Sequence, residues 1–189
     1  MIGSALKFGG MFSALALVAV NQAAAQHKDE HKAPDIKEAV AVLVPSKDSP
    51  VKGVIVLKQE HGFVQISGEV TGLTPGLHGF HIHMFGDLRS PDGMSAGGQY
   101  NPDGHEHGKP DSKDRHAGDL GNIEADAKGV AKVSVKSEGL SLHHVLGRGV
   151  VVHAKADDFS QPVGNAGARV AVGVIGIAEV KAPPAATKK

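Results

Sequence analysis

Residues 79–85 read Gly-Phe-His-Ile-His-Met-Phe. Alternate side chains of a β-strand share a face, so a strand here places three apolar side chains on one side and His81 and His83 on the other. The apolar side can pack on a core, which leaves the two imidazoles about 7 Å apart along one surface. Two neutral imidazoles on one rigid strand make half of a copper or zinc site. A third imidazole, His153, ends the β-rich run 150–152.

The strand signal continues on both sides of this stretch. Short runs rich in Val, Ile, Leu and Phe recur with Gly, Asp or Pro between them, and no stretch shows a convincing 3.6-residue period. The runs cover residues 38–44, 51–58, 62–70, 79–85, 129–136, 149–155 and 169–180. Many short strands separated by turns predict an all-β domain, either a sandwich or a Greek-key barrel.

One long segment between these runs has no strand character. Residues 86–119 hold many charges, glycines and prolines, and a loop of this length inside a domain is usually functional or held in place by something. It carries His105, His107, His116 and Asp119, and three imidazoles with a carboxylate are the ligand set of a tetrahedral zinc site. Bound zinc would also order a loop that buries little apolar surface. His105 in the same loop fits a solvated side chain equally well.

The composition limits the class of protein. The 20 basic and 20 acidic side chains give a formal net charge of zero, which argues against a nucleic-acid binder, because phosphate contacts need clustered Lys and Arg. A length of 189 residues and a hydrophobic fraction of 41% suit one globular domain. Cysteine is absent, so the chain has no disulfide, no thiolate zinc site and no cysteine nucleophile. The 12 histidines are the unusual feature that remains.

Both ends of the chain are expected to lie outside the domain. Residues 1–25 have one Lys before an apolar stretch and end Ala23-Ala24-Ala25, which predicts a cleaved secretory signal peptide rather than a membrane anchor. Residues 26–36 predict a disordered lead-in, and residues 182–189 predict a disordered tail. The sequence thus predicts a barrel domain over residues 37–181, in a protein that is exported to a periplasm or secreted, with no stable membrane anchor.

Several longer motifs follow one another along the chain. They are His78-Gly-Phe-His81-Ile-His83, Ser95-Ala-Gly, Asn101-Pro102, His107-Gly, Arg115-His116-Ala-Gly-Asp119-Leu-Gly-Asn122, Val151-Val-His153-Ala-Lys-Ala-Asp157-Asp158 and Gly164-Asn-Ala-Gly-Ala-Arg169-Val-Ala-Val-Gly173-Val-Ile-Gly. In this order the chain resembles the copper/zinc superoxide dismutase family over residues 38–180. The resemblance implies an eight-stranded Greek-key β-barrel, an immunoglobulin-like sandwich with long metal-binding loops.

The resemblance also implies a role for each matching position. Copper would be held by His81, His83 and His153, and zinc by His107, His116 and Asp119. Arg169 matches the arginine that guides superoxide toward copper. Asp157 matches a carboxylate behind the ligands, which would join His81 to His107, fix the ring tautomers and raise ligand basicity. His78 matches a structural histidine rather than a ligand.

One departure from the family pattern affects both metals. Where the family has Ser-Ala-Gly-x-His, this chain reads Ser-Ala-Gly-Gly-Gln over residues 95–99, so Gln99 occupies the position of the histidine that bridges copper and zinc. An imidazolate offers one nitrogen to each metal, whereas a neutral amide offers one carbonyl oxygen. Water, Gln99 or His105 could complete the copper site, and water could complete the zinc site. Zinc with an open position also fits a hydrolytic enzyme, although nothing nearby matches a general-base motif.

A second departure is the absence of the family disulfide. The two positions hold Gly93 and Val172 in this chain. A disulfide typically contributes ~2–4 kcal/mol to stability, largely by restricting the unfolded chain. Bound zinc or a homodimer would have to supply that stability instead. The segment 159–163 is also shorter than in animal members, which weakens any transfer of their charged steering loop.

The resemblance and its departures together predict the function. We expect copper-dependent dismutation of superoxide to oxygen and hydrogen peroxide, weakened by Gln99, with Arg169 attracting the anion. The alternative is a non-catalytic exported domain that binds copper and zinc to buffer or transfer metal. The three copper histidines fit both functions, whereas a superoxide-guiding arginine favours the enzyme. A third class, a structural barrel that binds a partner protein, finds no aromatic cluster to support it.

Overall fold

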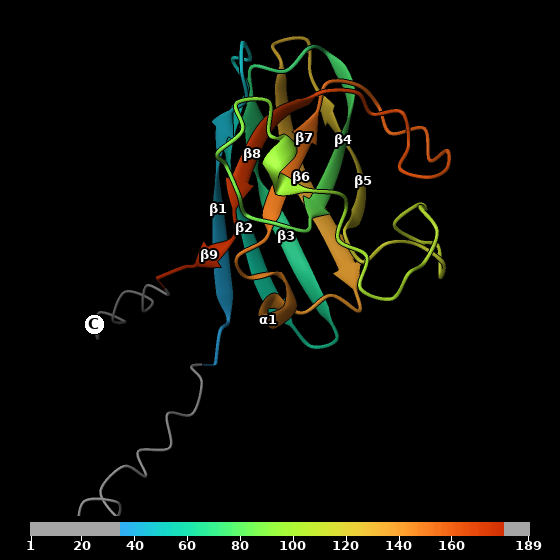
Figure 1. Ribbon diagram of the computed structural model, residues 1–189. Coiled ribbons are helices and arrows are strands. Elements are labelled where there is room, and N and C mark those ends of the chain that lie inside the picture. The colour runs from blue at the N-terminus through green and yellow to red at the C-terminus, as the bar shows by residue number, and fades with distance from the viewer. Residues whose placement is uncertain (1–34, 180–189) are drawn as a thin grey trace, which may run out of the picture. The chain divides into compact units, whose positions relative to one another are not determined.

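The computed structural model describes residues 35–179, and β-strands are its main regular structure (Figure 1). The strands are β1 (Glu38–Pro45), β2 (Lys52–Glu60), β3 (Phe63–Thr71), β4 (Gly76–His83), β5 (Asp119–Ala125), β6 (Val130–Glu138), β7 (Gly149–His153), β8 (Arg169–Val174) and β9 (Gly176–Ile177), with a 3-10 turn at Met94–Ala96 and a short helix α1 (Leu142–Val145). Neither helical segment of this described range is long and apolar enough to cross a bilayer. The predicted signal peptide, most of the lead-in and the tail lie outside the described residues, while Ile36 is buried in the core.

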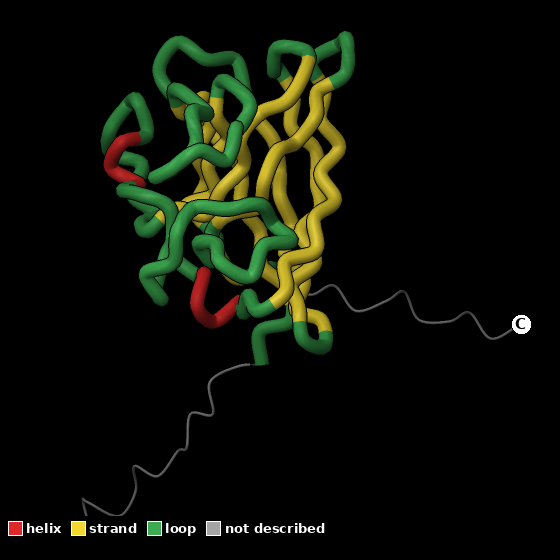
Figure 2. Tube along the Cα trace, turned by 90° about the vertical axis from the view of Figure 1, so that its right-hand side faces the viewer, coloured by secondary structure: helices red, strands yellow, loops and turns green. Residues whose placement is uncertain are grey.

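The strands form one antiparallel sheet that closes on itself. Their order is β2-β3-β6-β5-β4-β7-β8-β1-β9, and β1 also pairs with β2, which closes eight strands into a barrel. The two-residue strand β9 extends the sheet beside β1. The chain crosses the barrel from β3 to β4 and from β6 to β7, because neither pair is adjacent in the sheet (Figure 1). Figure 2 shows the loops gathered on one side of the strands. The predicted eight-stranded Greek-key barrel is therefore confirmed.

The runs predicted from the sequence correspond to seven barrel strands and omit β5. This strand pairs with β4, and a bulge shifts the register between Gly79 and His81. Within β5, Gly121 adopts a φ of 81°, and Leu120 and Ile123 are both buried although they are three positions apart. A bulge displaces side chains from the strict period of two. The alternation that would have revealed β5 is therefore absent from its sequence.

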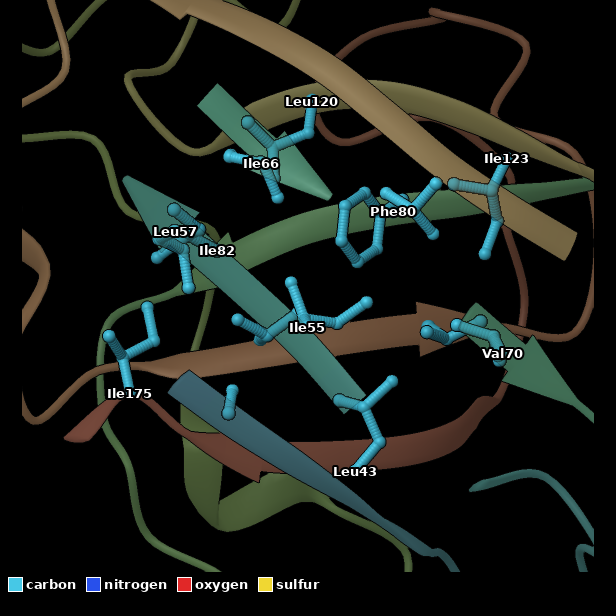
Figure 3. Close-up of a cluster of buried hydrophobic side chains, with 14 of the residues drawn as sticks. Leu43, Ile55, Leu57, Ile66, Val70, Phe80, Ile82, Leu120, Ile123 and Ile175 are labelled. Carbon is cyan, nitrogen blue, oxygen red and sulfur yellow. The ribbon is translucent and has the colours of Figure 1, made fainter. Parts of the chain in front are cut away.

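Aliphatic side chains fill the barrel interior (Figure 3). The core draws on strands from both halves of the chain and includes Leu43, Ile55, Leu57, Ile66, Val70, Phe80, Ile82, Leu120, Ile123 and Ile175. Phe80 and Ile82 from β4 are fully buried in it. Because side chains alternate along a strand, His81 and His83 point to the outer face of the barrel.

The two imidazoles on that outer face do not lie at the protein surface. His81 is 0% exposed and His83 is 2% exposed. The long loops after β4 and β7 cover them: Ile82 N–H donates to the Gly118 carbonyl over 2.9 Å, so the first loop runs against β4. A Cβ at Gly118 would lie 2.2 Å from the Ile82 carbonyl oxygen, so only glycine permits this approach.

Candidate metal centre

Three imidazoles converge on the outer face of β4 and β7, which are adjacent antiparallel strands. His81 and His83 come from β4, and His153 is the last residue of β7. The His153 ring centroid lies 5.0 Å from that of His81 and 5.6 Å from that of His83. One ligand nitrogen from each ring lies within 4.8 Å of the others. The three side chains can therefore bind one metal ion.

Hydrogen bonds to backbone carbonyls orient two of the three rings. Nδ1 of His83 donates to the Gly97 carbonyl over 2.9 Å, and Nδ1 of His153 donates to the Gly167 carbonyl over 3.0 Å. The Nε2 atoms of both rings are buried and have no hydrogen-bond partner among the described residues. Each Nε2 thus carries a free lone pair. Buried polar atoms are rarely left unpaired, so this pair of orphaned nitrogens is what a metal site requires.

Burial also keeps two of these imidazoles neutral. It lowers the pKa of His83 to about 3, with the Arg169 charge acting in the same direction. Burial, followed by the charge of His81, lowers the pKa of His153 to about 4. Metal ligation requires the deprotonated nitrogen. These rings are therefore ready to bind a cation at neutral pH without losing a proton.

A second cluster lies beside the first and centres on Asp119. One carboxylate oxygen, Oδ1, lies 3.1 Å from Nδ1 of His107 and 3.2 Å from Nδ1 of His116. The other oxygen, Oδ2, accepts the backbone N–H groups of Gly108 over 3.0 Å and His116 over 2.9 Å, which fixes the carboxylate. His81 also comes within 4.8 Å of the ligand atoms of His107 and Asp119, so the two clusters adjoin at that ring.

The His107 ring shows that the second cluster suits a cation. Its Nε2 donates to Oδ1 of Asp157 over 3.0 Å, so the neutral ring carries a lone pair on Nδ1. That Nδ1 is buried, has no hydrogen-bond partner in the described chain, and faces the Asp119 carboxylate. A lone pair against a carboxylate oxygen is repulsive unless a cation lies between them. Two imidazoles and a carboxylate are also suitable donors for zinc.

Asp157 joins the two clusters. Its Oδ2 accepts Nε2–H of His81 over 2.8 Å, and its Oδ1 accepts Nε2–H of His107. Burial alone would raise the pKa of Asp157, but the hydrogen bonds from the two imidazoles lower it to about 2. The carboxylate is therefore ionised, and it holds both rings with their Nδ1 atoms directed away from it.

The Gln99 side chain lies between the clusters. Its Oε1 is 2.8 Å from Nδ1 of His116, and its Nε2 is 3.2 Å from Nδ1 of His81. Nε2 also donates to the Val163 carbonyl over 3.2 Å. An isolated β-bridge to His83 places the Gln99 backbone beside the end of β4. The amide thus contacts one ring of each cluster.

A cleft of about 460 Å³ leads to the first cluster. Its lining includes His83, His153, Gln99 and Arg169. The Arg169 guanidinium donates to the carbonyls of Gly93 and Gly97, each over 2.6 Å. Burial lowers the pKa of Arg169, but an arginine stays protonated in proteins. The cleft therefore presents a fixed positive charge beside the imidazoles.

Two further predicted positions are accounted for. Both ring nitrogens of His78 lie 2.8 Å from backbone carbonyl oxygens, those of His153 and Thr74, so this ring supports the end of β7 and has no atom free for a metal. His105 is exposed, and its Nδ1 lies 2.9 Å from Oδ1 of Asp114. It does not join either cluster, so the alternative that it completes the copper site is wrong.

Two positioning residues were not predicted. Asn122 exchanges hydrogen bonds with the backbone of Asp157, over 2.7 Å and 2.9 Å. Gln161 does the same for the backbone of His107, over 3.1 Å and 2.7 Å. Asn122 ends one of the recognised motifs, which is a signal that could have identified it. Gln161 lies outside every motif.

The positions of the missing disulfide are adjacent in space. A Cβ built at Gly93 would lie 2.8 Å from Cγ2 of Val172. Val172 is buried and packs with Ala96 and Val151 in a small apolar cluster. Apolar packing thus occupies the place that a disulfide holds in the family.

The chain is similar to known proteins in sequence and in fold. A family model described as copper/zinc superoxide dismutase (SODC) matches residues 51–175. The extracellular superoxide dismutase (Cu-Zn) of Onchocerca volvulus is 47% identical over 159 residues, which cover 76% of this chain and 78% of the relative. Superoxide dismutase (Cu-Zn) 2 of Mesembryanthemum crystallinum is 47% identical over 148 residues, which cover 72% of this chain and 94% of the relative. The crystal structure of the clock protein EA4 superposes with a TM-score of 0.72 at 40% identity, over 78% of this chain and 99% of that chain.

Proposed function

Because the chain belongs to the copper/zinc superoxide dismutase family of oxidoreductases, we propose that it catalyses copper-dependent dismutation of superoxide to oxygen and hydrogen peroxide, at a lower rate than a member with the bridging histidine. Copper would be held by His81, His83 and His153, and zinc by His107, His116 and Asp119. The observation that carries this proposal is the pair of orphaned Nε2 atoms on His83 and His153 at the end of a cleft with a fixed positive charge.

Bound copper supplies the one-electron redox chemistry, and the chain supplies geometry and charge. The Gly97 and Gly167 carbonyls hold His83 and His153 with Nε2 toward the ion, and Asp157 holds His81 with Nδ1 toward it. A hydrogen bond from a ligand imidazole to a carboxylate fixes the tautomer and raises ligand basicity. The His83 and His153 rings therefore need little rearrangement when the ion binds, whereas Nδ1 of His81 would exchange its contact with the Gln99 amide for the ion.

Arg169 attracts and orients the anionic substrate. Its guanidinium lines the cleft, and its two backbone acceptors hold it in one position. A positive charge in a cleft raises the encounter rate of small anions. The approach path thus leads superoxide toward the imidazoles of His83 and His153.

Gln99 is the reason for the lower rate. A bridging imidazole can hold and release a proton between the two metal positions, whereas a neutral amide does not titrate. The proton needed for peroxide must therefore come from water in the cleft. This limit applies to proton delivery and leaves the three copper ligands intact.

The test is a superoxide assay on copper- and zinc-loaded wild type and Gln99→His, with the metal content of each measured. We expect activity in the wild type that disappears when copper is removed, and a higher rate in Gln99→His. A wild-type rate equal to that of Gln99→His would contradict the weakening. No activity in fully copper-loaded protein would contradict dismutation itself.

The alternative function is metal buffering or transfer by an exported, non-catalytic domain. The loss of the bridging histidine favours it, since such a domain does not need coupled metals. Arg169 argues against it, because a cation carrier gains nothing from a positive charge beside its site. Copper-loaded protein that is inactive and gives its copper up readily to a chelator would support the alternative.

We also propose a homodimer and export. Phe85 and Leu88 are 57% and 41% exposed and line one surface cavity together with the half-exposed Val174. An exposed apolar patch of this kind suits contact with a second copy. Sedimentation of wild type and Phe85→Glu tests it, with a monomer expected only for the variant. Cleavage after residue 25 in the exported protein, measured by mass, tests the signal peptide.

A further inference from the structure

Gln99 has a fixed backbone and a buried side chain. Tyr100 N–H donates to the Ile82 carbonyl and Met84 N–H to the Gly98 carbonyl, each over 2.8 Å, so hydrogen bonds hold the chain on both sides of it. The side chain is only 9% exposed. The direction of its amide is therefore determined by its neighbours and not by solvent.

Those neighbours define which end of the amide faces which cluster. The Val163 carbonyl can only accept a hydrogen bond, so the atom 3.2 Å from it is the amide nitrogen. The second amide hydrogen points to Nδ1 of His81. This nitrogen carries a lone pair, because the N–H of that ring is on Nε2 and donates to Asp157. The carbonyl oxygen is then left facing Nδ1 of His116.

We propose that Oε1 of Gln99 is the fourth ligand of zinc, and that Gln99 gives no ligand to copper. The proposal rests on the assignment of zinc to His107, His116 and Asp119 in the proposed function. It closes the zinc site with four protein donors, the arrangement of a structural site. It leaves the open coordination position to copper, on the side of the cleft.

Two distances at His116 are short enough for these donors to share one ion. Ligand atoms of a tetrahedral zinc ion lie about 3.3 Å apart, given bond lengths near 2.0–2.1 Å. Oε1 of Gln99 is 2.8 Å from Nδ1 of His116, and Oδ1 of Asp119 is 3.2 Å from the same nitrogen. Without metal, the Nδ1 proton of His116 lies among these oxygens. Zinc would take the place of that proton, and the neutral ring would then carry its N–H on Nε2.

The nitrogen end of the amide explains why copper gains no ligand. An amide NH2 group has no lone pair available for a metal. Turning the amide over would place Nε2 against the His116 N–H and remove its hydrogen bond to Val163. That arrangement would face two N–H donors against each other and would take this donor away from the Val163 carbonyl. A hydrolytic zinc with an open position is also excluded by the same assignment.

The test measures metal binding in copper-free protein, with Zn²⁺ affinity from chelator competition and Co²⁺ absorption as a probe of coordination number. Gln99→Ala is expected to lower zinc affinity about tenfold or more and to shift the Co²⁺ spectrum away from four-coordination. Its copper affinity is expected not to fall, because Nδ1 of His81 loses only its contact with the Gln99 amide. Gln65→Ala is the matched control, because Gln65 is a half-buried barrel residue on β3, outside both clusters.

Gln99→Glu keeps an oxygen at the same position and is expected to bind zinc at least as tightly as wild type. Weaker zinc binding by folded Gln99→Glu would contradict the proposal. So would an unchanged zinc affinity in Gln99→Ala, or a loss of copper affinity larger than the loss of zinc affinity. These measurements use no turnover, so an inactive copper-loaded wild type would overturn the proposed function and leave the zinc result standing.

Discussion

Arg169 and His83 share one hydrogen-bond acceptor, the backbone carbonyl oxygen of Gly97. Nη2 of Arg169 donates to it over 2.6 Å, and Nδ1 of His83 donates over 2.9 Å. The charge proposed to attract the anion and the ring proposed to bind copper are therefore positioned by the same atom. A movement of this carbonyl would disturb both.

Two substitutions of Arg169 distinguish the effect of its positive charge from the effect of its fixed position. Lysine keeps the charge but cannot make both guanidinium hydrogen bonds, whereas glutamine loses the charge. We expect Arg169→Gln to lower kcat/KM about tenfold or more at low ionic strength, and Arg169→Lys to lower it less. Wild-type kcat/KM should fall as salt is added, with a flatter dependence in Arg169→Gln. Equal salt dependence in the two proteins would contradict a steering role.

Asp92 should oppose that steering. Its carboxylate lines the same cleft, and its pKa is lowered chiefly by the Met94 backbone N–H and also by the Arg169 charge. Asp92→Asn is therefore expected to raise kcat/KM severalfold at low ionic strength. The gain should shrink at high salt, where charges are screened beyond a few ångströms. Asp103→Asn, an exposed carboxylate outside the cleft, is the control and should leave the rate unchanged.

The metal-free protein should lose stability on acidification. The pKa values of His83 and His153 are about 3 and about 4 in the fold, against 6.5 ordinarily, chiefly through burial. Between these values and 6.5 the unfolded chain binds protons that the folded chain does not, so the free energy of unfolding falls as pH drops below 6.5. Each pKa unit corresponds to about 1.4 kcal/mol, so the total is several kcal/mol.

Urea unfolding of the metal-free protein at a series of pH values measures this loss. His83→Gln removes one of the two titrating rings, and we expect a shallower dependence on pH in that variant. A free energy of unfolding that stays constant from neutral pH to the lower pKa values would show that the rings are not buried as neutral groups.

Alanine at Gly93 is expected to destabilise the fold more than alanine at Gly104, another glycine with a positive φ. The φ of Gly93 is 73°, and a Cβ would lie 2.8 Å from Cγ2 of Val172. Gly104 has nearly the same φ, 71°, with nothing within 4 Å of a Cβ. Gly104→Ala therefore measures the backbone cost alone, roughly 1–3 kcal/mol. Gly93→Ala should cost more, because the contact is added, and thermal unfolding of the two variants compares them.

Most of the barrel could be predicted because its strands have regular patterns. Phe80 and Ile82 alternate with two histidines along the chain. This alternation predicts a strand and shows which side chains lie on each of its faces. In β5 the bulge and the positive φ of Gly121 remove that alternation, so no periodicity remained to detect. The local pattern of a strand is informative only where its backbone is regular.

The residues of the site could be predicted where they stand in a motif. Their burial and orientation could not, because these depend on the tertiary arrangement. The residues of both clusters stand in recognisable motifs. The burial of His81 and His83 depends on loops folding over β4, which no local pattern of that strand reveals. The direction of the Gln99 amide depends on the Val163 carbonyl, 64 residues away in the chain. Contacts of that separation follow from the fold and not from neighbouring residues.

The Asp157 carboxylate joins the two clusters through hydrogen bonds although no imidazole bridges them. One of its oxygens faces His81, and the other faces His107. A cation on Nδ1 of His107 makes the opposite N–H more acidic and draws charge from this carboxylate, so less negative charge remains for His81. Zinc occupancy would in this way adjust the electron richness of a copper ligand. The reduction potential of copper bound at His81 would thus still depend on zinc at His107, although Gln99 stands where the family has a bridging histidine.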